Sequence, residues 1–545
     1  MVMFGFRKQW AGSSCIVGGG ASKLRGFLLA VSVRRVVGFV GVGLVFLFGS
    51  LEIDAEGKAQ VRAVAGFEPS WASLSAYEAP EWFRDAKFGI YAHWGVYSAT
   101  GGTRNTDWYS RNMYDPNHRN YREHVTNHGS VDEFGYKDLI PHFSGEHFDA
   151  QEWVSLYLEA GARFAGPVAE HSDGFAMWAT DLTPWNAGGM GPKRDVVGEM
   201  AKAVKKAGMK FLMSFHHHWR WGWYPTWDQE TDCADPNFAS LYGRKLPSTA
   251  WGTRGAKGER VDVMRPVPLP DEAFNVSWLS HVKEVIDRYR PDMLWFDNRM
   301  EIIEESKRLE MLAYFYNQGR EWGSDVVLTY KRPDLREGVA TIDLERARMP
   351  GIYPDPWLTD SSIASSSWSY AEDLEYYSSN RLIDDLVDIV SKNGCLLLNL
   401  APAPDGTIPK PQQDRLREMG AWLRIHREAI YGTRPWMVFG EGPTITEQGH
   451  LADLKFKGFD ARDIRFTCSK DRKRLYVILL GWPHAGRVEI GSMGKRSGNV
   501  VAARWLSNGE SLDFYLDDER LVLNLPAKPI GSHAHVVVLE GKALW

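Results

Sequence analysis

The sequence predicts an α/β protein with parallel strands, followed by a smaller all-β domain. From about residue 75, amphipathic helical stretches alternate with short apolar runs, and this pattern indicates parallel strands joined by right-handed crossovers. From about residue 435, short strand candidates are separated by turn residues with no long helical pattern between them, which is typical of a β-sandwich. The length of 545 residues is sufficient for several domains, each with its own hydrophobic core.

The first predicted unit opens with an apolar strand over residues 88–94. A helix over residues 151–160 ends at Gly161, and a second strand follows over residues 164–169. Pro167 lies within that second strand, and because proline donates no backbone hydrogen bond, it argues against a central position in a sheet.

The later units repeat the same order of helix and strand, ending in a series of short strands alone. Three helix-then-strand pairs are expected at 195–207 with 209–215, 278–289 with 293–297, and 382–390 with 396–400. In the all-β part, strands are expected at 474–480, 500–505, 521–525 and 534–539.

The composition excludes several classes of protein. Hydrophobic residues make up 44% of the chain and charged residues 24%, which is ordinary for a globular protein and excludes a multi-span membrane protein. A net charge of −5 gives no general basic surface, so we expect no nucleic-acid partner. The 23 tryptophans suit stacking against sugars, although large cores also use tryptophan.

The first 55 residues predict a signal peptide or N-terminal leader. Arg34 and Arg35 precede an apolar run over residues 36–48 that is too short to span a bilayer as a helix, so we expect export. An uncleaved membrane anchor remains the alternative. Removal of the leader takes Cys15 with it and leaves three cysteines, an odd number that predicts no essential disulfide framework.

Candidate functional residues follow the predicted strands. His93, His171, His216 and Asp297 each lie at or just past the carboxyl end of a separate predicted strand. In an α/β barrel the functional residues gather at this end of the strands, so the four side chains are expected to meet. Any one of these histidines taken alone could instead be a core or capping residue with its hydrogen bonds satisfied.

Six separated blocks of the sequence carry a family resemblance. They are Lys87–Gly95, Trp108–Tyr114, Asp173–Phe175, Gly191–Asp195, Leu294–Asp297 and Leu397–Pro409. In this order they resemble the motif series of the glycoside hydrolase family 29 α-L-fucosidases, and the resemblance extends through 431–436. It implies a (β/α)8-like catalytic barrel over residues 75–436, a β-sandwich over 437–545, and hydrolysis of terminal α-L-fucose with retention of configuration.

The resemblance also implies where the two catalytic carboxylates lie. A retaining glycosidase needs one carboxylate as nucleophile and a second carboxyl group as acid and then base. Asp297, after the Trp-Phe pair, matches the nucleophile, whereas the acid/base lies on a variable loop of the family, where Glu345 is the candidate. Glu337 is the next candidate for that role. A helix cap is the alternative for Asp297.

The charged neighbours of Glu345 leave another interpretation open. Asp343, Arg346 and Arg348 lie close to it in the sequence. With Glu345 they could form an exposed cluster of salt bridges that has no catalytic role.

Substrate contacts are implied for four residues that lie in or directly beside three of the matched blocks. His93 matches the family histidine that hydrogen-bonds a fucose hydroxyl, and Trp295 is expected to line the pocket beside the nucleophile. Asp107 precedes Trp108 where many members have glutamate, which shortens the side chain by one methylene but retains the acceptor.

The histidine pattern departs from the family at one position. The family has paired histidines before its Asp-Gly-Phe block, whereas here His171 is followed by Ser172, which puts the exact sugar in doubt. We expect His216 and His217 to compensate as substrate-binding residues. With His218 they form three consecutive histidines, which could also hold zinc. A retaining mechanism needs no metal, so we expect neither a metal nor a cofactor.

The predicted function is therefore that of an exported retaining α-L-fucosidase that acts on a carbohydrate substrate. Two alternatives remain open: an α-L-galactosidase or related glycosidase, and a non-catalytic sugar-binding protein on the same fold. No nucleic-acid partner and no membrane contact beyond the leader are expected. The linkage, the natural polymer and the assembly into a homo-oligomer are left open.

Overall fold

The chain forms two compact units, residues 1–65 and 66–545. A computed structural model describes residues 49–53, 59–63, 66–102, 104–251, 263–483, 486–495, 498–542 and 544. In the first unit, strands β1 (Gly49–Ile53) and β2 (Ala59–Ala63) pair antiparallel. The apolar run of the predicted leader and Cys15 lie outside the described residues, and the leader stays a prediction. Among the described residues, no helix combines the length and the apolar character that a membrane span requires.

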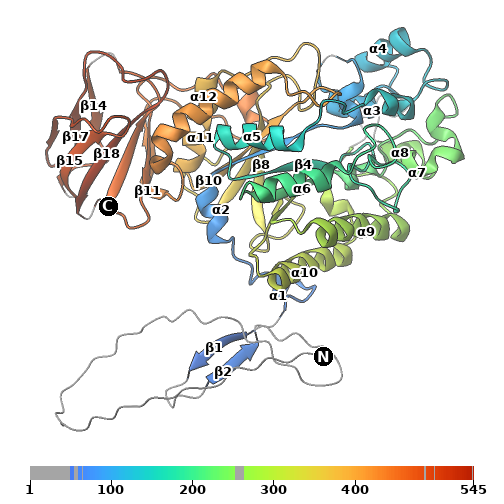
Figure 1. Cartoon of the computed structure of the whole chain (residues 1–545), viewed down its shortest axis with the longest axis horizontal. Helices are drawn as coiled ribbons and strands as arrows, with labels where there is room; N and C mark the ends of the chain where they lie inside the picture. The colour runs from blue at the N-terminus through green and yellow to red at the C-terminus, as the bar shows by residue number, and fades with distance from the viewer. Residues whose placement is uncertain are drawn as a thin grey trace, which may run out of the picture. The chain divides into compact units, whose positions relative to one another are not determined.

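The second unit contains a closed barrel of eight parallel strands (Figure 1). Strand β10 closes it against β3, with Leu396 opposite Phe88. The barrel and the antiparallel sheets that follow confirm the predicted fold class. In order around the barrel the strands are β3 (Phe88–Ala92), β4 (Phe164–Glu170), β5 (Lys210–Phe215), β6 (Met293–Phe296), β7 (Val327–Tyr330), β8 (Thr341–Glu345), β9 (Trp357–Ser362) and β10 (Gly394–Leu400).

Strand β4 is a full member of the barrel although it contains Pro167. It pairs with β3 and with β5, so the expectation that the proline keeps this strand from a central position is wrong. Pro167 lies opposite Ala92, and the ladder toward β5 shifts register between Val168 and Glu170. An irregular ladder at this point reduces the cost of the missing amide donor.

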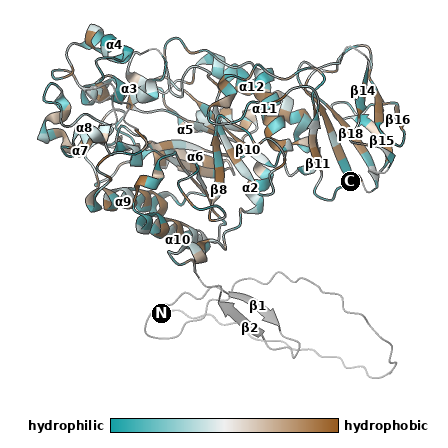
Figure 2. Cartoon of the chain, turned by 180° about the vertical axis from the view of Figure 1, so that it is seen from behind, coloured by the Kyte–Doolittle hydropathy of each residue, from teal (hydrophilic) through white to brown (hydrophobic). Residues whose placement is uncertain are grey.

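The helices of this unit surround the barrel or lie in its loops, and Figure 2 shows that α9 and α10 carry both hydrophilic and hydrophobic residues. Asp149 caps α5 by accepting from the backbone amides of residues 151 and 152, and Gly161 ends it with a φ of 95°. The helices are α1 (Trp71–Leu74), α2 (Glu81–Ala86), α3 (Tyr109–Asn112), α4 (Arg119–His128), α5 (Ala150–Ala160), α6 (Val196–Lys206), α7 (Ala239–Tyr242), α8 (Ser248–Trp251), α9 (Glu272–Tyr289), α10 (Glu305–Trp322), α11 (Ser379–Ser391) and α12 (Lys410–His426).

Alternating residues of the barrel strands belong to two different cores. In β6, Met293 and Trp295 belong to an inner cluster, whereas Leu294 and Phe296 belong to the layer packed against the helices. Strands β4 and β5 approach closely at Gly166, where a Cβ atom would lie 1.6 Å from the carbonyl oxygen of Leu212. Because every strand is covered on both faces, the strands are rigid supports for the residues that follow them.

The C-terminal strands form two antiparallel sheets around a separate core, as expected for a β-sandwich. The described cysteines Cys233, Cys395 and Cys468 are buried and free. The predicted domain limits, 75–436 and 437–545, stay a prediction. One sheet contains β11 (Arg434–Glu441), β12 (Ile464–Cys468), β13 (Arg474–Leu479), β18 (His535–Lys542) and β15 (Asn499–Trp505), and the other contains β14 (Arg487–Ile490), β17 (Leu521–Asn524) and β16 (Phe514–Leu516).

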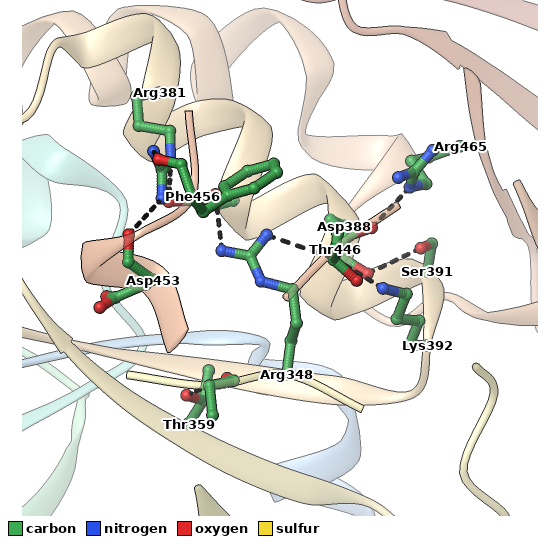
Figure 3. A network of polar contacts seen from close by, with 12 residues as sticks. Arg348, Thr359, Arg381, Asp388, Ser391, Lys392, Thr446, Asp453, Phe456 and Arg465 are labelled. Carbon is green, nitrogen blue, oxygen red and sulfur yellow. Dashed lines mark hydrogen bonds and ion pairs between the residues drawn. The ribbon is translucent and has the colours of Figure 1, made fainter. Parts of the chain in front are cut away.

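A buried carboxylate on α11 joins the barrel to the sandwich (Figure 3). Asp388 is fully buried and lies 2.9 Å from Nζ of Lys392, 3.4 Å from Nη1 of Arg348 and 2.6 Å from Nε of Arg465, which belongs to strand β12. Burial alone would raise the pKa of Asp388, but the three cations outweigh it and hold that pKa below its ordinary value. The ion pairs therefore fix the two domains to each other.

Candidate active site

A pocket opens at the carboxyl ends of the barrel strands. His93 directly follows β3, His171 follows β4, His216 follows β5 and Asp297 follows β6, so the expected placement at strand ends is confirmed. The pocket contains about 370 Å³ of empty space, mouth included. Its lining residues are Tyr91, His93, Asp107, Trp108, His171, Ser172, His216, Trp219, Trp295, Asp297, Glu345, Asp360 and Trp368.

Asp297 is held in the pocket by contacts from both sides. Its amide donates to the carbonyl of Phe215, Asn298 donates a backbone hydrogen bond of 2.8 Å to Oδ1, and Nδ1 of His216 lies 3.2 Å from Oδ2. Burial would raise the pKa of Asp297, but His216 and Lys331 outweigh that effect and hold the pKa below its ordinary value. The carboxylate is therefore ionised and fixed in direction, as a nucleophile requires.

Lys331 directly follows β7 and lies among four carboxylates. Its Nζ lies 2.8 Å from Asp360, 2.9 Å from Asp343, 3.8 Å from Glu345 and 4.0 Å from Asp297. Burial opposes the charge of the ammonium group, but the carboxylates outweigh burial and raise the pKa of Lys331 well above its ordinary value. One buried cation therefore faces both candidate catalytic carboxylates.

Glu345 is the last residue of strand β8, and its pKa is shifted in the opposite direction to that of Asp297. Burial raises its pKa to about 8; Lys331 opposes this shift, and the charge of Asp297 adds to it. Two carboxyl groups in one pocket whose pKa values are pushed apart form a typical pair of nucleophile and acid. Glu345 therefore holds a proton near neutral pH while Asp297 does not.

The alternatives for the acid fare less well in the structure. The loop expected around Glu345 is instead a barrel strand, and Asp343, Arg346 and Arg348 are all buried, so the exposed cluster of salt bridges is wrong. The other candidate, Glu337, has a side chain that is 64% exposed and pairs with Arg332 at 2.8 Å. Glu337 is not among the residues that line the pocket.

Three imidazoles form one wall of the pocket. The ring centroids of His171 and His216 lie 4.3 Å apart, and that of His93 lies 5.5 Å from the first and 5.2 Å from the second. Nδ1 of His93 is hydrogen-bonded to Oδ1 of Asn399 at 2.8 Å. Burial, together with the neighbouring His216, lowers the pKa of His93 to about 3, so its ring is neutral and available to a hydroxyl group.

Several buried polar atoms of the pocket find no hydrogen-bonding partner within the described part of the chain. They are Oδ1 of Asp107, Nδ1 of His171, Nε2 of His216 and Nε1 of Trp219. Burial raises the pKa of Asp107 to about 6. Because buried polar groups are normally paired, a set of unpaired donors and acceptors around one pocket fits a ligand with several hydroxyl groups.

Comparison with known protein families identifies the family of this chain. A family model described as Alpha-L-fucosidase matches residues 55–428, and one described as Alpha-L-fucosidase C-terminal domain matches residues 459–539. The chain belongs to the α-L-fucosidase family. The first match covers most of the chain, and it includes every residue that lines the pocket.

Individual relatives agree with this membership. Human plasma alpha-L-fucosidase is 26% identical over 472 residues, covering 84% of this chain and 88% of that protein. Rat tissue alpha-L-fucosidase is 27% identical over 509 residues, covering 90% and 95%. The Thermotoga maritima alpha-fucosidase solved in complex with fucose is 28% identical, with a TM-score of 0.67 and coverage of 87% of this chain and all of that one.

Within this member of the family, the structure does not bring His217 to the pocket. After β5 the chain turns into a 3-10 helix, His217–Arg220, so consecutive histidines point in different directions. Nδ1 of His217 lies 2.6 Å from Oε1 of Glu170, whose Oε2 accepts from His281 at 2.7 Å. Nε2 of His218 contacts the backbone oxygen of Asn298 instead.

Among the residues that the structure describes, two groups of side chains could nevertheless hold a metal ion. The ligand atoms of His93, His171 and His216 lie within 4.8 Å of one another, and so do those of Glu170, His217 and His281. Neither group is the run of three consecutive histidines that suggested zinc. Glu170 is hydrogen-bonded to His281 at 2.7 Å and lies 2.6 Å from Nδ1 of His217, and contacts this short favour a carboxylate between two imidazoles over three ligands of one ion.

The aromatic residues of the pocket include two that were predicted, Trp108 and Trp295, and others that sequence reasoning missed. Trp295 donates from Nε1 to Asp343 at 2.9 Å, and its ring lies under the ammonium group of Lys331, with 4.6 Å from Nζ to the centroid. Trp108 packs against Trp219, with ring centroids 5.3 Å apart. The pocket residues that were not predicted are Tyr91, Ser172, Asp360 and Trp368, together with Lys331 behind them.

Proposed function

We propose that this protein is a retaining exo-α-L-fucosidase that releases terminal α-L-fucosyl residues from glycans or fucose-containing polysaccharides. The observation that carries the proposal is the pair of buried carboxyl groups beside Lys331, ionised at Asp297 and protonated at Glu345. Membership of the family supports the choice of fucose, because the relatives and solved structures that the chain resembles are fucosidases.

In the first step, a carboxylate oxygen of Asp297 attacks the anomeric carbon of the sugar. Glu345 donates its proton to the glycosidic oxygen while the bond between that oxygen and the anomeric carbon breaks. The aglycone leaves as a neutral alcohol, and the sugar remains as an ester of Asp297. Lys331 stabilises the negative charge that Glu345 acquires, since its Nζ lies 3.8 Å from Oε2.

In the second step, Glu345 acts as the base. Esterification removes the charge of Asp297, which contributed to the raised pKa of Glu345, so that pKa falls and the carboxylate form is favoured. Glu345 accepts a proton from water, the water oxygen attacks the anomeric carbon, and the bond to Asp297 breaks. Two displacements at one carbon restore its original configuration.

The remaining predicted residues are proposed to bind the sugar. His93, His171 and His216 present ring nitrogens to its hydroxyl groups, and Asp107 adds an acceptor. The indoles of Trp108 and Trp295 supply walls for its carbon faces, in keeping with the expected use of tryptophan. His217 has no place in this set, because its ring contacts Glu170 rather than the pocket.

A panel of nitrophenyl glycosides tests the proposal directly. The purified protein should hydrolyse nitrophenyl α-L-fucoside, and NMR should show α-L-fucose as the first product, before mutarotation. β-L-Fucose as the first product would contradict retention, and hydrolysis of the α-L-galactoside alone would indicate the related glycosidase. Binding of fucose with no turnover of any glycoside would indicate a sugar-binding protein instead.

We also propose that the protein is exported. The apolar run that follows Arg34 and Arg35 supports this, and so does the similarity to a plasma fucosidase. Fractionation of cells that express the full chain, with sequencing of the mature N-terminus, tests it. A soluble exported chain starting near residue 56 supports cleavage, a membrane-bound chain that retains the leader supports an anchor, and a cytosolic chain contradicts export.

A further inference from the structure

A segment of the C-terminal part of the chain returns to the edge of the candidate active site. Residues 442–463 connect β11 to β12 of the sandwich, yet their middle pairs with the end of the barrel strand β8. The amide of Leu451 donates to the carbonyl of Glu345 at 3.1 Å, and the amide of Asp453 donates to that of Arg346 at 2.9 Å. The connecting segment therefore pairs through its backbone with Glu345 and the residue that follows it.

Side chains from two other elements hold the segment in place (Figure 3). Asp453 is buried, and its Oδ2 accepts a hydrogen bond of 2.7 Å from Ser361 at the end of β9. Arg381 of α11 donates to the carbonyls of Phe456, at 2.8 Å, and Asp453, at 3.3 Å. Anchors on α11, on β8 and on β9 give the segment a defined position against the barrel rather than that of a loose surface loop.

The backbone at the point of contact is in a conformation that ordinary residues rarely adopt. Leu451 has a φ of 57° and Arg346 has a φ of 44°, both in the left-handed region. A left-handed conformation is unfavourable for a non-glycine residue and is retained where the surrounding structure demands it, most often at functional sites. The two strained residues stand directly next to Glu345 and His450.

His450 lies on the solvent side of Glu345. Its Nδ1 is 3.6 Å from Oε2 of Glu345, and its side chain is 59% exposed whereas that of Glu345 is 14% exposed. The other charged groups that act on this carboxyl are in the pocket or buried behind it: Lys331, Asp297, Asp360 and Arg346. A leaving group that takes a proton from Glu345 must depart past its exposed side, where the imidazole stands.

We propose that His450 forms part of the binding site for the leaving group and determines which aglycones are accepted. The proposal rests on the proposed function, because only a glycosidase with Glu345 as its acid has a leaving group at this position. An imidazole can donate to or accept from a sugar hydroxyl, and its ring offers a flat face to a second sugar. The expected partner is therefore the hydroxyl-bearing sugar to which fucose is attached.

The choice of substrates separates this role from a structural one. A nitrophenyl leaving group has no hydroxyl groups for His450 and leaves with little help from the acid, whereas the sugar of a fucosyl disaccharide has several. In His450→Ala, we expect kcat/KM for fucosyl lactose or fucosyl-N-acetylglucosamine to fall roughly five- to tenfold, because one hydrogen bond is lost. The kcat/KM for nitrophenyl α-L-fucoside should stay within about twofold of the wild-type value.

Two further variants complete the test. His450→Gln retains a donor and an acceptor and should recover part of the disaccharide activity. His147→Ala removes an exposed histidine elsewhere and should leave kcat/KM unchanged for both substrates. An equal fall on both substrates, or no fall on any disaccharide cleaved by the wild type, would overturn the proposal. A wild-type protein that cleaves no α-L-fucoside at all would instead refute the proposed function.

Discussion

The ammonium nitrogen of Lys331 lies 3.8 Å from Oε2 of Glu345, yet the pKa of that carboxyl remains raised to about 8. A cation so close would ordinarily favour the ionised carboxylate. Here Asp343 and Asp360 lie nearer to the same nitrogen, at 2.9 and 2.8 Å, and share its charge. Burial and the charge of Asp297 then prevail, so the acid retains its proton.

Replacing Lys331 should move the whole pH profile upward. Lys331 lowers the pKa of both Asp297 and Glu345, so Lys331→Gln should raise both values and shift both limbs of kcat/KM to higher pH. The maximal rate should also fall, because the charge formed on Glu345 loses its stabilising partner. Lys331→Arg, which retains a cation, should leave the limbs near their original positions. A profile that is unchanged in the glutamine variant would contradict this role.

Replacing Asp297 should abolish turnover without unfolding the protein. In Asp297→Gly the nucleophile is absent, so kcat should fall by about three orders of magnitude or more, while the thermal unfolding midpoint stays near that of the wild type. Added azide can take the place of the missing carboxylate and should restore cleavage of a nitrophenyl fucoside, with β-L-fucosyl azide and nitrophenolate as products. Wild-type rates in this variant would exclude Asp297 as nucleophile.

Glu345 should control the alkaline limb of the pH profile. Its protonated form is the active one, so kcat/KM should fall as the pH rises through about 8, whereas the lowered pKa of Asp297 places the acid limb well below neutrality. Glu345→Gln should remove the alkaline limb and reduce activity far more on disaccharides than on nitrophenyl fucoside. As a control, Glu337→Gln at the exposed site should behave as wild type. The opposite result would move the acid to Glu337.

The carboxylate behind the pocket should matter for stability. Glu170 is fully buried between His217 and His281, and it directly precedes His171 of the pocket wall. In Glu170→Gln an amide replaces one acceptor, so we expect unfolding to require about 1 to 3 kcal/mol less free energy, measured by denaturant titration. Glu305→Gln, at an exposed position at the start of α10, is a suitable control. Equal stability of both variants would show that the buried contacts contribute little.

Removal of metal ions should leave activity unchanged. The pocket histidines are proposed to bind hydroxyl groups, so exhaustive treatment with a chelator should not alter kcat/KM, and His216→Ala should lower it by roughly 5- to 150-fold through the loss of a hydrogen bond. Elemental analysis before and after chelation is the measurement. Loss of activity that zinc restores would require a mechanism built around a metal-bound water.

The parts of the fold that could be predicted are those with apolar runs that few polar residues interrupt. The strands that precede His93, His171, His216 and Asp297 have such runs, bounded by glycine, proline or a helix, and all four were placed correctly. Strands β7, β8 and β9 were not predicted as strands. Threonine, aspartate and serine interrupt their apolar character.

The same limit explains which site residues were missed. Lys331 and Asp360 are single charged residues at or near the ends of two of those short strands, and nothing in the local sequence distinguishes them from surface charges. His217 was placed in the pocket because it follows His216, but a 3-10 turn separates the directions of neighbouring side chains. The direction in which a side chain points after the end of a strand depends on the turn that follows, and sequence periodicity does not predict that turn.

The ion pairs of Asp388 have a consequence for how this enzyme family can diversify. Because they fix the sandwich to the barrel, and because a segment of the sandwich side carries His450 to the rim of the pocket, the two domains are not interchangeable modules. A sandwich taken from a relative would bring its own version of that rim. Exchanging the sandwich of this protein would thus change the rim at His450 and, on our proposal, the aglycone preference, while every residue that lines the pocket stays in place.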